Sequence, residues 1–599
     1  MQLQSPSLAR LLVFTRYLLG WSGLGDQNNS QVWLNAGDAQ KPLVGAFDRD
    51  KVLTPSLKEY IRNATTSLEI PGLSVAVVHA EDETEFGSWG IRSESGDPMT
   101  SDTMFTIASC SKAFMSTAMA ILIDDYANGR NSTPLPEAVR QFDWETKIKA
   151  LLPDDWNLMD SWAEEKANIK DILSHVSGIP RHDLSYSRSD TPESVLKRLQ
   201  YLRPAFELRQ QFSYNNLMYM VGAHIFNIYA GGYTKFVENR VFKPLGMSST
   251  FSPKTAAASG KATHTWSRDG RRIPRWFTEE DFELSVGPGG VIASAEDLVR
   301  SFYQCEKWVK MHLHGGIDSH TNHTIVPQDL LEETTSAHVI YDGTSTDPQM
   351  SIKGYGMGWT RYSLWGHDIV MHTGGIPGIT TVVTLAPTFG IGVVVLINAD
   401  GHNAAAAMTD ISNEILSRSF QVTVTPGETQ PSHQPGLVTP TPSNSETREA
   451  MPAFDFTGTY HDNGYGHFIV CNTTTSSDYC HQVLADFKAV DPHTPAPTEL
   501  YASYPRLWST HLRFTHVKDH RFYVKPTALF PVGYGKNTTP FEVPFDGGVG
   551  EDGFAIADFV VEDGKVVGFG FSGTVAQKTM MQKKGGSVKE TAEAWFERV

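Results

Sequence analysis

Two side chains three residues apart could form a nucleophile and its base. Ser109 and Lys112 stand in the run SCSK at 109–112. Residues with this spacing lie on the same face of a helix, so the hydroxyl and the amine can come within hydrogen-bonding distance. A serine hydroxyl attacks well once a neighbouring base takes its proton, and burial lowers the pKa of a lysine enough for it to be that base. The pattern alone also fits a solvated helix face, but the apolar residues that follow it favour a buried helix.

A second candidate group lies at the start of another apolar run, FSYNNLMYMVGAHIF. Here Tyr214 and Asn216 are separated by one residue. A phenol can relay a proton, and an amide can position both Lys112 and a substrate. The alternative for this segment is a loop that caps a helix.

A third candidate group, His372-Thr373-Gly374-Gly375, directly precedes a strand-like run. The imidazole and hydroxyl offer polar contacts, and glycines remove side chains that would block a substrate backbone at a strand edge. The alternative is a glycine-rich turn. We assign five residues of these groups to substrate binding: Asn216, His372, Thr373, Gly374 and Gly375.

Taken in this order, Ser-x-x-Lys, Tyr-x-Asn and His-Thr-Gly resemble the motifs of the serine β-lactamase and penicillin-binding protein superfamily. The Tyr-x-Asn form resembles the class C-like branch, which includes D-aminopeptidases, D,D-carboxypeptidases and family VIII esterases. The resemblance covers roughly residues 45–420. Four further segments look like this branch: ILSHVSGIP, KPLGMSSTF, GPGGVIASAEDL and YGMGW.

The resemblance implies a role for each residue. Ser109 would attack a carbonyl carbon, with Lys112 and Tyr214 acting together as base. The backbone N–H groups of Ser109 and Gly375 would hold the oxyanion, and the Tyr214 hydroxyl would protonate the leaving group. This chemistry needs no metal and no organic cofactor.

One departure from the family pattern affects the expected substrate. Class C β-lactamases carry lysine where this chain has His372. We therefore predict a serine hydrolase of the esterase or D-amino-acid peptidase type, acting on a small ester, amide or peptide, rather than a true β-lactamase. An acyltransferase would use the same residues and stays open. A non-catalytic ligand-binding homologue is the remaining alternative, which the three intact motifs disfavour.

Other conspicuous residues have less specific interpretations. His175 is predicted to be a structural hydrogen-bonding residue, and Cys110 a packing residue beside the nucleophile. His264 has no second ligand at the spacing of a metal site, so no metal is predicted. The segment Arg181-His182-Asp183 either contacts substrate or forms a turn after Pro180.

The elements that position these motifs follow from the hydrophobic pattern. A helix that is apolar nearly all round, as at 109–125, must be buried. Strand-like runs at both ends of this region, with helical segments between them, predict an α/β (α+β) fold. It combines an antiparallel sheet flanked by helices with an all-helical subdomain between roughly 125 and 290, as in β-lactamases and transpeptidases. The predicted helices are 56–68, 109–125 and 403–419, and the predicted strands are 73–80, 86–92, 379–386 and 391–399.

Changes in composition divide the chain into four parts. An N-terminal extension (1–44) precedes the catalytic domain (45–421). Residues 422–452 are rich in Pro, Ser and Thr and cannot bury a core, so they are predicted to be a linker. Residues 453–599 are predicted to form an all-β domain, either a closed lipocalin-like barrel or a sandwich, that ends in a short helix at 588–597.

The bulk properties exclude several classes of partner. The net charge of −17 over 599 residues argues against non-specific binding to nucleic acid or to anionic membranes. No run reaches the roughly 20 apolar residues that cross a bilayer. Among the four cysteines, Cys471 and Cys480 are the pair that could form a disulfide. The oligomeric state is left open.

Two signals for cellular location disagree. Residues 11–25 resemble a weak signal peptide interrupted by Arg16, and the chain has six Asn-x-Ser/Thr sequons. The broken apolar run favours an intracellular soluble enzyme over a secreted one.

Overall fold

The computed structural model describes residues 51–599 apart from 82–83, 132, 300–306, 319, 346, 423–450, 546–554 and 574–584. The predicted N-terminal extension, its signal-like segment and nearly all of the predicted linker therefore lie outside the described residues. The three predicted boundaries between the four parts stay predictions. Residues Lys51–Val599 belong to one compact unit.

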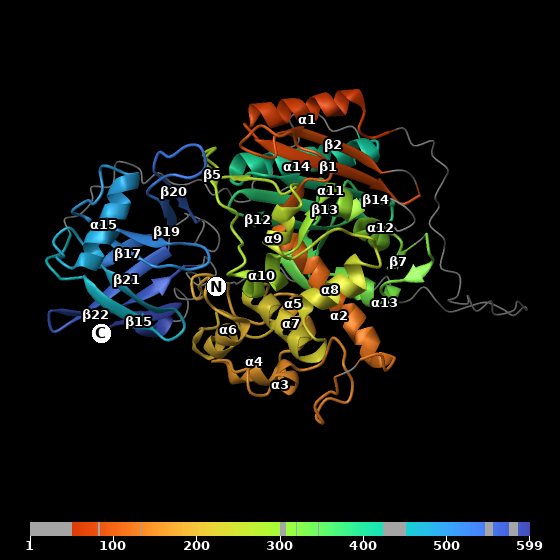
Figure 1. The fold of residues 1–599 in the computed structure, drawn as a ribbon. Helices are drawn as coiled ribbons and strands as arrows, with labels where there is room; N and C mark the ends of the chain where they lie inside the picture. Colours follow the sequence, from red (N-terminus) through yellow and green to blue (C-terminus); the bar gives the residue numbers. More distant parts are fainter. Residues whose placement is uncertain are drawn as a thin grey trace, which may run out of the picture. The chain divides into compact units, whose positions relative to one another are not determined.

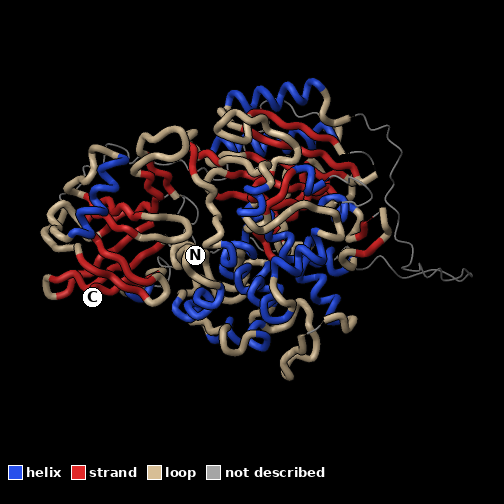
Figure 2. The backbone as a smooth tube through the Cα atoms, viewed as in Figure 1, coloured by secondary structure: helices blue, strands red, loops and turns tan. Residues whose placement is uncertain are grey.

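An eight-stranded antiparallel sheet forms the centre of the catalytic region (Figures 1 and 2). Its first strand in the chain pairs with a strand more than 300 residues later, and in this pair Leu73 lies opposite Ile397. The sheet is thus assembled from both ends of the region, as predicted. In spatial order the strands are β2 (Glu85–Gly90), β1 (Gly72–His79), β14 (Ile391–Ile397), β13 (Ile379–Ala386), β12 (His367–Ile376), β11 (Thr360–Leu364), β10 (Lys353–Tyr355) and β9 (Val339–Asp342).

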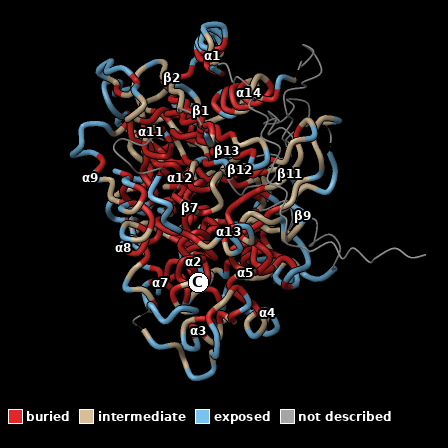
Figure 3. Tube along the Cα trace, turned by 90° about the vertical axis from the view of Figure 1, so that its right-hand side faces the viewer, coloured by how far each residue is buried: buried red, intermediate tan, exposed pale blue. Residues whose placement is uncertain are grey.

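Helices cover both faces of this sheet, so its central strands are buried along their whole length (Figure 3). Successive residues of a strand point to opposite faces. Val75 accordingly packs with the core around helices α1 and α14, and Ala76 packs with the core that includes α2 and α12. The four helices are α1 (Pro55–Ser67), α14 (His402–Ser419), α2 (Ser111–Ala127) and α12 (Trp308–Leu313).

The insertion between α2 and the later strands is mainly helical, as predicted, and packs around α7. One short hairpin interrupts it, formed by β4 (Thr265–Trp266) and β5 (Arg272–Ile273). Its helices are α3 (Ile148–Leu151), α4 (Ser161–Lys166), α5 (Ile169–Leu173), α6 (Pro192–Arg198), α7 (Asn216–Tyr229), α8 (Tyr233–Val237), α9 (Pro253–Ala258) and α10 (Phe282–Gly289).

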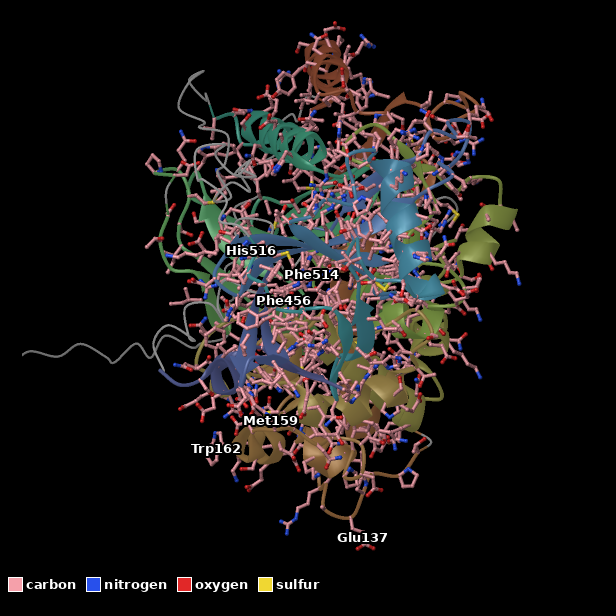
Figure 4. The ribbon with its side chains drawn as sticks, turned by 90° about the vertical axis from the view of Figure 1, so that its left-hand side faces the viewer. Glu137, Met159, Trp162, Phe456, Phe514 and His516 are labelled. Atoms are coloured by element: carbon pink, nitrogen blue, oxygen red, sulfur yellow. A yellow bond between two sulfur atoms is a disulfide. The ribbon has the colours of Figure 1, made fainter. Side chains whose placement is uncertain are left out.

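The C-terminal region is a nine-stranded antiparallel sheet that closes into a barrel. Reciprocal backbone hydrogen bonds of 2.7 and 2.9 Å between Cys471 and Tyr501 join the two edge strands. Phe456 and Phe514, labelled in Figure 4, are buried among its strands. In spatial order the strands are β16 (Gly466–Val470), β15 (Gly458–Asp462), β23 (Ala594–Arg598), β22 (Lys565–Ser572), β21 (Ala555–Glu562), β19 (Arg521–Phe530), β18 (His511–Lys518) and β17 (Glu499–Ser503), with β20 (Phe541–Pro544) paired to β19.

The end of the chain differs from the prediction. The expected helix at 588–597 is limited to α17 (Val588–Thr591), and the chain then forms strand β23. Ala594 and Phe596 are buried while Trp595 is less so, which is a period of two rather than 3.6. Phe596 stacks on Phe569 of β22 with ring centroids 4.9 Å apart, so pairing with the barrel decides the local structure.

A helix that the sequence reading did not predict, α15 (Asp478–Val490), lies within the barrel region. It carries Cys480, which forms a disulfide with Cys471 at the barrel seam. The proposed cysteine pair is therefore confirmed. The predicted intracellular location stays a prediction.

The barrel contacts the helical insertion through a segment between β17 and β18. The Tyr504 hydroxyl and the Arg506 Nε both donate to the backbone carbonyl of Leu184, each at 3.1 Å. The backbone N–H of Leu507 donates to the carbonyl of Tyr186 at 3.1 Å. No helix within the described residues is long and apolar enough to cross a bilayer.

Candidate active site

Ser109 lies where the chain turns into the buried helix α2. Residues Ala108–Cys110 form a single 3₁₀ turn, and α2 continues from it. Ala108 has φ of +48°, in the left-handed region that residues with a side chain seldom adopt. The helix predicted at 109–125 is therefore present, and this sharp turn places Ser109 at its N-terminal end.

The Lys112 amine lies within hydrogen-bonding distance of three oxygens. Its Nζ is 3.2 Å from Ser109 Oγ, 2.9 Å from Asn216 Oδ1 and 2.8 Å from the Pro288 carbonyl. The side chain is fully buried. Burial, followed by the nearby charge of Arg181, holds the pKa of Lys112 well below its usual value.

This geometry fixes the direction of the lysine lone pair. A neutral amine has two N–H donors and one lone pair, whereas a carbonyl oxygen can only accept. The two hydrogens are therefore directed at Asn216 and Pro288, and the lone pair is left facing Ser109. In its neutral form Lys112 is placed to accept the serine proton.

Tyr214 contacts the same serine from another element. Its hydroxyl is 2.8 Å from Ser109 Oγ, and its ring lies 4.7 Å from Lys112 Nζ. It precedes α7, which Asn215 caps by accepting the backbone N–H of Leu217. Burial raises the pKa of the Tyr214 phenol. The residue is consequently a neutral hydroxyl at pH 7, able to donate a proton to the reacting centre.

Two residues beside Tyr214 hold its loop in place. His175 Nδ1 accepts the backbone N–H of Asn215 at 3.1 Å, and burial lowers the pKa of His175, so the ring is neutral. This agrees with the predicted structural role. Arg181 borders the cavity with its guanidinium 5.1 Å from the Tyr214 ring, and its Nε donates to Asp183 at 2.6 Å.

His372 does not border the cavity. Its Nε2 is 3.0 Å from the Tyr355 hydroxyl, and its Nδ1 is 2.6 Å from the Thr373 carbonyl. Burial, with a smaller effect from Lys112, lowers the pKa of His372 to about 3, so the ring is neutral. Cys110 donates to the His372 carbonyl at 3.2 Å, and burial raises the pKa of this thiol to about 11.

The two glycines of the third motif have different surroundings. A Cβ on Gly374 would lie 2.3 Å from the Ile107 carbonyl, so glycine is needed where β12 approaches the serine turn. A Cβ on Gly375 would meet nothing within 4 Å. Thr373, Gly374 and Gly375 all border the cavity next to Ser109.

A cavity of about 580 Å³ opens over Ser109. Asn216, Met220 and Phe277 of the helical insertion line one part of it, and β12 lines another. A further wall comes from the barrel: Leu507, Trp508, Pro544 and Phe545.

The sequence reading missed this barrel wall entirely. Trp508 stacks on Phe545 with centroids 5.4 Å apart, and its edge meets Phe277 at 5.8 Å. The residues of the barrel wall belong to none of the three motifs, and they lie about 400 residues from Ser109 in the chain. Only long-range packing brings them to the cavity.

Comparison with known proteins shows the family of this chain. The Beta-lactamase family model matches residues 57–415. The chain belongs to the β-lactamase family, a family of serine hydrolases.

Individual relatives are more distant. The chain is 27% identical over 386 residues to "Unguisins hydrolase ungD'" of Aspergillus campestris (strain IBT 28561), covering 63% of this chain and 67% of the relative. It is also 27% identical over 380 residues to "Unguisins hydrolase ungD" of Aspergillus violaceofuscus (strain CBS 115571), covering 60% and 62%. The match thus spans about two thirds of the length of these relatives. Among solved structures, the octameric penicillin-binding protein homologue from Pyrococcus abyssi has a TM-score of 0.48 at 17% identity, covering 86% of this chain and 97% of that one.

Proposed function

We propose that this protein hydrolyses an ester or amide bond through an acyl-enzyme on Ser109. The observation that carries the proposal is the environment of Lys112. Two carbonyl oxygens take its two hydrogens and leave its lone pair facing Ser109 Oγ at 3.2 Å. A buried neutral amine in this arrangement is a general base for the serine proton.

Acylation then follows from the geometry. Lys112 takes the Ser109 proton as Oγ attacks the substrate carbonyl carbon, and the carbonyl oxygen becomes negative. The backbone N–H groups of Ser109 and Gly375 are proposed to hold that oxyanion, since such donors stabilise charge that develops in the transition state. The bond to the leaving group breaks as the carbonyl re-forms.

Tyr214 is proposed to supply the proton for the leaving group. Its phenol is neutral and 2.8 Å from Ser109 Oγ, where the leaving atom departs. The proton held by Lys112 then returns to the Tyr214 phenolate, whose ring lies 4.7 Å from Lys112 Nζ, so that both groups regain their starting forms. In deacylation water gives its proton to this pair and attacks the acyl carbon, and Ser109 leaves with a proton.

The cavity indicates which substrates fit. Its barrel wall and Phe277 present aromatic and aliphatic surface, which favours an apolar substituent next to the scissile bond. His372 is neutral and buried, so it does not offer the positive charge that lysine would offer a β-lactam carboxylate. We therefore propose apolar esters and peptide-like amides as substrates, with β-lactams turned over slowly.

Intact mass spectrometry tests this proposal. The protein is incubated with p-nitrophenyl esters of increasing acyl length, D-amino-acid amides, a penicillin and, because two relatives are named as hydrolases of unguisins, an unguisin. We expect an acyl adduct on wild-type protein and none on Ser109→Ala. An adduct that persists on the variant would refute Ser109 as nucleophile. Product analysis with added amine or alcohol acceptors separates hydrolysis from acyl transfer.

A further inference from the structure

A continuous hydrogen-bond chain runs from the C-terminal barrel to the catalytic lysine. We infer that Trp508 of the barrel is a positioning residue that sets the basicity of Lys112 through Tyr186, Asp183 and Asn216. The inference rests on the proposed role of Lys112 as base. It assigns the barrel a part in the chemistry in addition to its part in the cavity wall.

The first half of the chain has a fixed direction. Trp508 Nε1–H donates to the Tyr186 hydroxyl at 2.9 Å, and an indole N–H can only donate. The Tyr186 hydroxyl therefore directs its own proton away from the indole and donates to Asp183 Oδ1 at 2.6 Å. Trp508, Tyr186 and Asp183 are each less than 10% exposed, so little water competes for these bonds.

The second half orients an amide. Asn216 Nδ2 donates to the same Asp183 Oδ1 at 3.3 Å. With its NH₂ group held toward the carboxylate, the opposite side of the amide presents Oδ1 to Lys112 Nζ at 2.9 Å. This contact is one of the two that direct the lysine lone pair at Ser109. Asp183 thus connects the barrel to the orientation of the base.

The hydrogen-bond chain also affects how strongly the negative charge of Asp183 acts on Lys112. The Asp183 carboxylate raises the pKa of Lys112, against the larger lowering effects of burial and of Arg181. Hydrogen bonds to a carboxylate spread its negative charge and weaken that effect. Losing the Trp508 donor frees the Tyr186 hydroxyl to turn away from Asp183, and the pKa of Lys112 rises. The groups that face Lys112 in this site are Ser109, Cys110, His175, Arg181, Asp183, Tyr214, Asn216, Tyr219 and His372.

A second contact between barrel and insertion provides a matched control. Tyr465 of the barrel region bonds His182 Nδ1 at 2.8 Å and donates to Glu593 at 2.6 Å. Tyr465 is buried, like Trp508, and also bridges the two regions, but within the part of the chain that the structure describes its hydrogen bonds do not lead to Lys112. Tyr465→Phe therefore weakens the contact between barrel and insertion but leaves every hydrogen bond from Trp508 to Lys112 in place.

The test measures how fast a fluorophosphonate probe labels Ser109 between pH 5 and 10 in the full-length protein. The acid limb of this profile reports the pKa of the base. For Trp508→Phe, which keeps an aromatic ring in the cavity wall, we expect the acid limb to move up by about 0.5 pH unit, which is a roughly threefold slower labelling at low pH relative to the variant's own alkaline plateau. Tyr186→Phe removes the next link and should give the same shift. The double variant should shift no further, because both break one chain.

The outcomes separate the alternatives. An unchanged limb in Trp508→Phe, with only a lower plateau or a higher KM for substrates, would show that Trp508 is a wall and nothing more. An equal shift in Tyr465→Phe would attribute the effect to docking and overturn the inference. If Trp508→Phe does not fold, as judged by thermal unfolding, Tyr186→Phe decides the matter. Wild-type protein that is not labelled at Ser109 would refute the proposed function itself.

Discussion

At the scale of single residues, the site depends on Lys112 and Tyr214, whose pKa values are shifted in opposite directions. Burial lowers the pKa of Lys112 and raises that of Tyr214, so loss of solvent favours the uncharged form of both side chains. One can then accept a proton and the other can donate one. The same physical cause, loss of solvent, produces the opposite functions because it disfavours the charged form of each group.

These two residues are expected to act as a unit. Lys112→Ala removes the base, and Tyr214→Phe keeps the ring but removes the hydroxyl 2.8 Å from Ser109. Each change should lower kcat/KM on an activated ester by about 10²–10⁴, the range of positioned acid–base catalysis. The double variant should lose little more. Losses that simply multiply, in proteins whose circular dichroism matches wild type, would contradict the shared proton path.

The sequence predicts these residues but not their surroundings. Ser109, Lys112, Tyr214 and Asn216 belong to short motifs, and the structure brings all four together. Trp508 and Asp183 belong to no such motif. Their roles follow from contacts between distant segments, which spacing along the chain does not reveal.

At the scale of elements, periodicity predicts those that are long and strongly patterned. The buried helix after Ser109 and the hairpin of β13 and β14 agree with the prediction. Helix α15 has 13 residues, as many as the predicted helix α1, and it was missed because it lies among strands. Its signals are present: Ser477 caps it, and Cys480, Val483 and Phe487 follow at helical spacing and are buried.

The approach of β12 to the serine turn predicts contrasting effects of two neighbouring substitutions. Gly374→Ala places a methyl group 2.3 Å from the Ile107 carbonyl, so either the strand or the turn must move. We expect a loss of about 1–3 kcal/mol in the free energy of unfolding, as for other overpacked sites. Gly375→Ala meets no atom within 4 Å and should change stability by much less. Urea unfolding of both variants measures this difference, and equal losses would contradict the close approach.

At the scale of the whole molecule, the barrel is held shut at one seam. Cys471 pairs with Tyr501 through backbone hydrogen bonds and with Cys480 through the disulfide. The barrel also supplies four residues of the cavity wall. Its stability therefore bears on the shape of the active site.

Removal of this disulfide tests how much the bond contributes to the stability of the protein. Replacing both cysteines by alanine should lower stability by about 2–4 kcal/mol, the usual range for a native disulfide. Differential scanning calorimetry with and without reductant measures the effect. Reductant should lower the Tm of wild type toward that of the double variant and leave the variant unchanged. A wild-type Tm that is insensitive to a reductant shown by thiol titration to break the bond would contradict a stabilising role.

The mixed origin of the cavity wall has a consequence for how this enzyme diversifies. Ser109, Lys112 and Tyr214 lie in the catalytic region, whereas Leu507 and Phe545 lie in the barrel region. Exchanges at Leu507, Pro544 and Phe545 alter the wall without altering any hydrogen bond to the nucleophile. Libraries restricted to these three positions are therefore the economical place to select new substrate preferences. Trp508 is the position to leave untouched, since it belongs to both wall and hydrogen-bond chain.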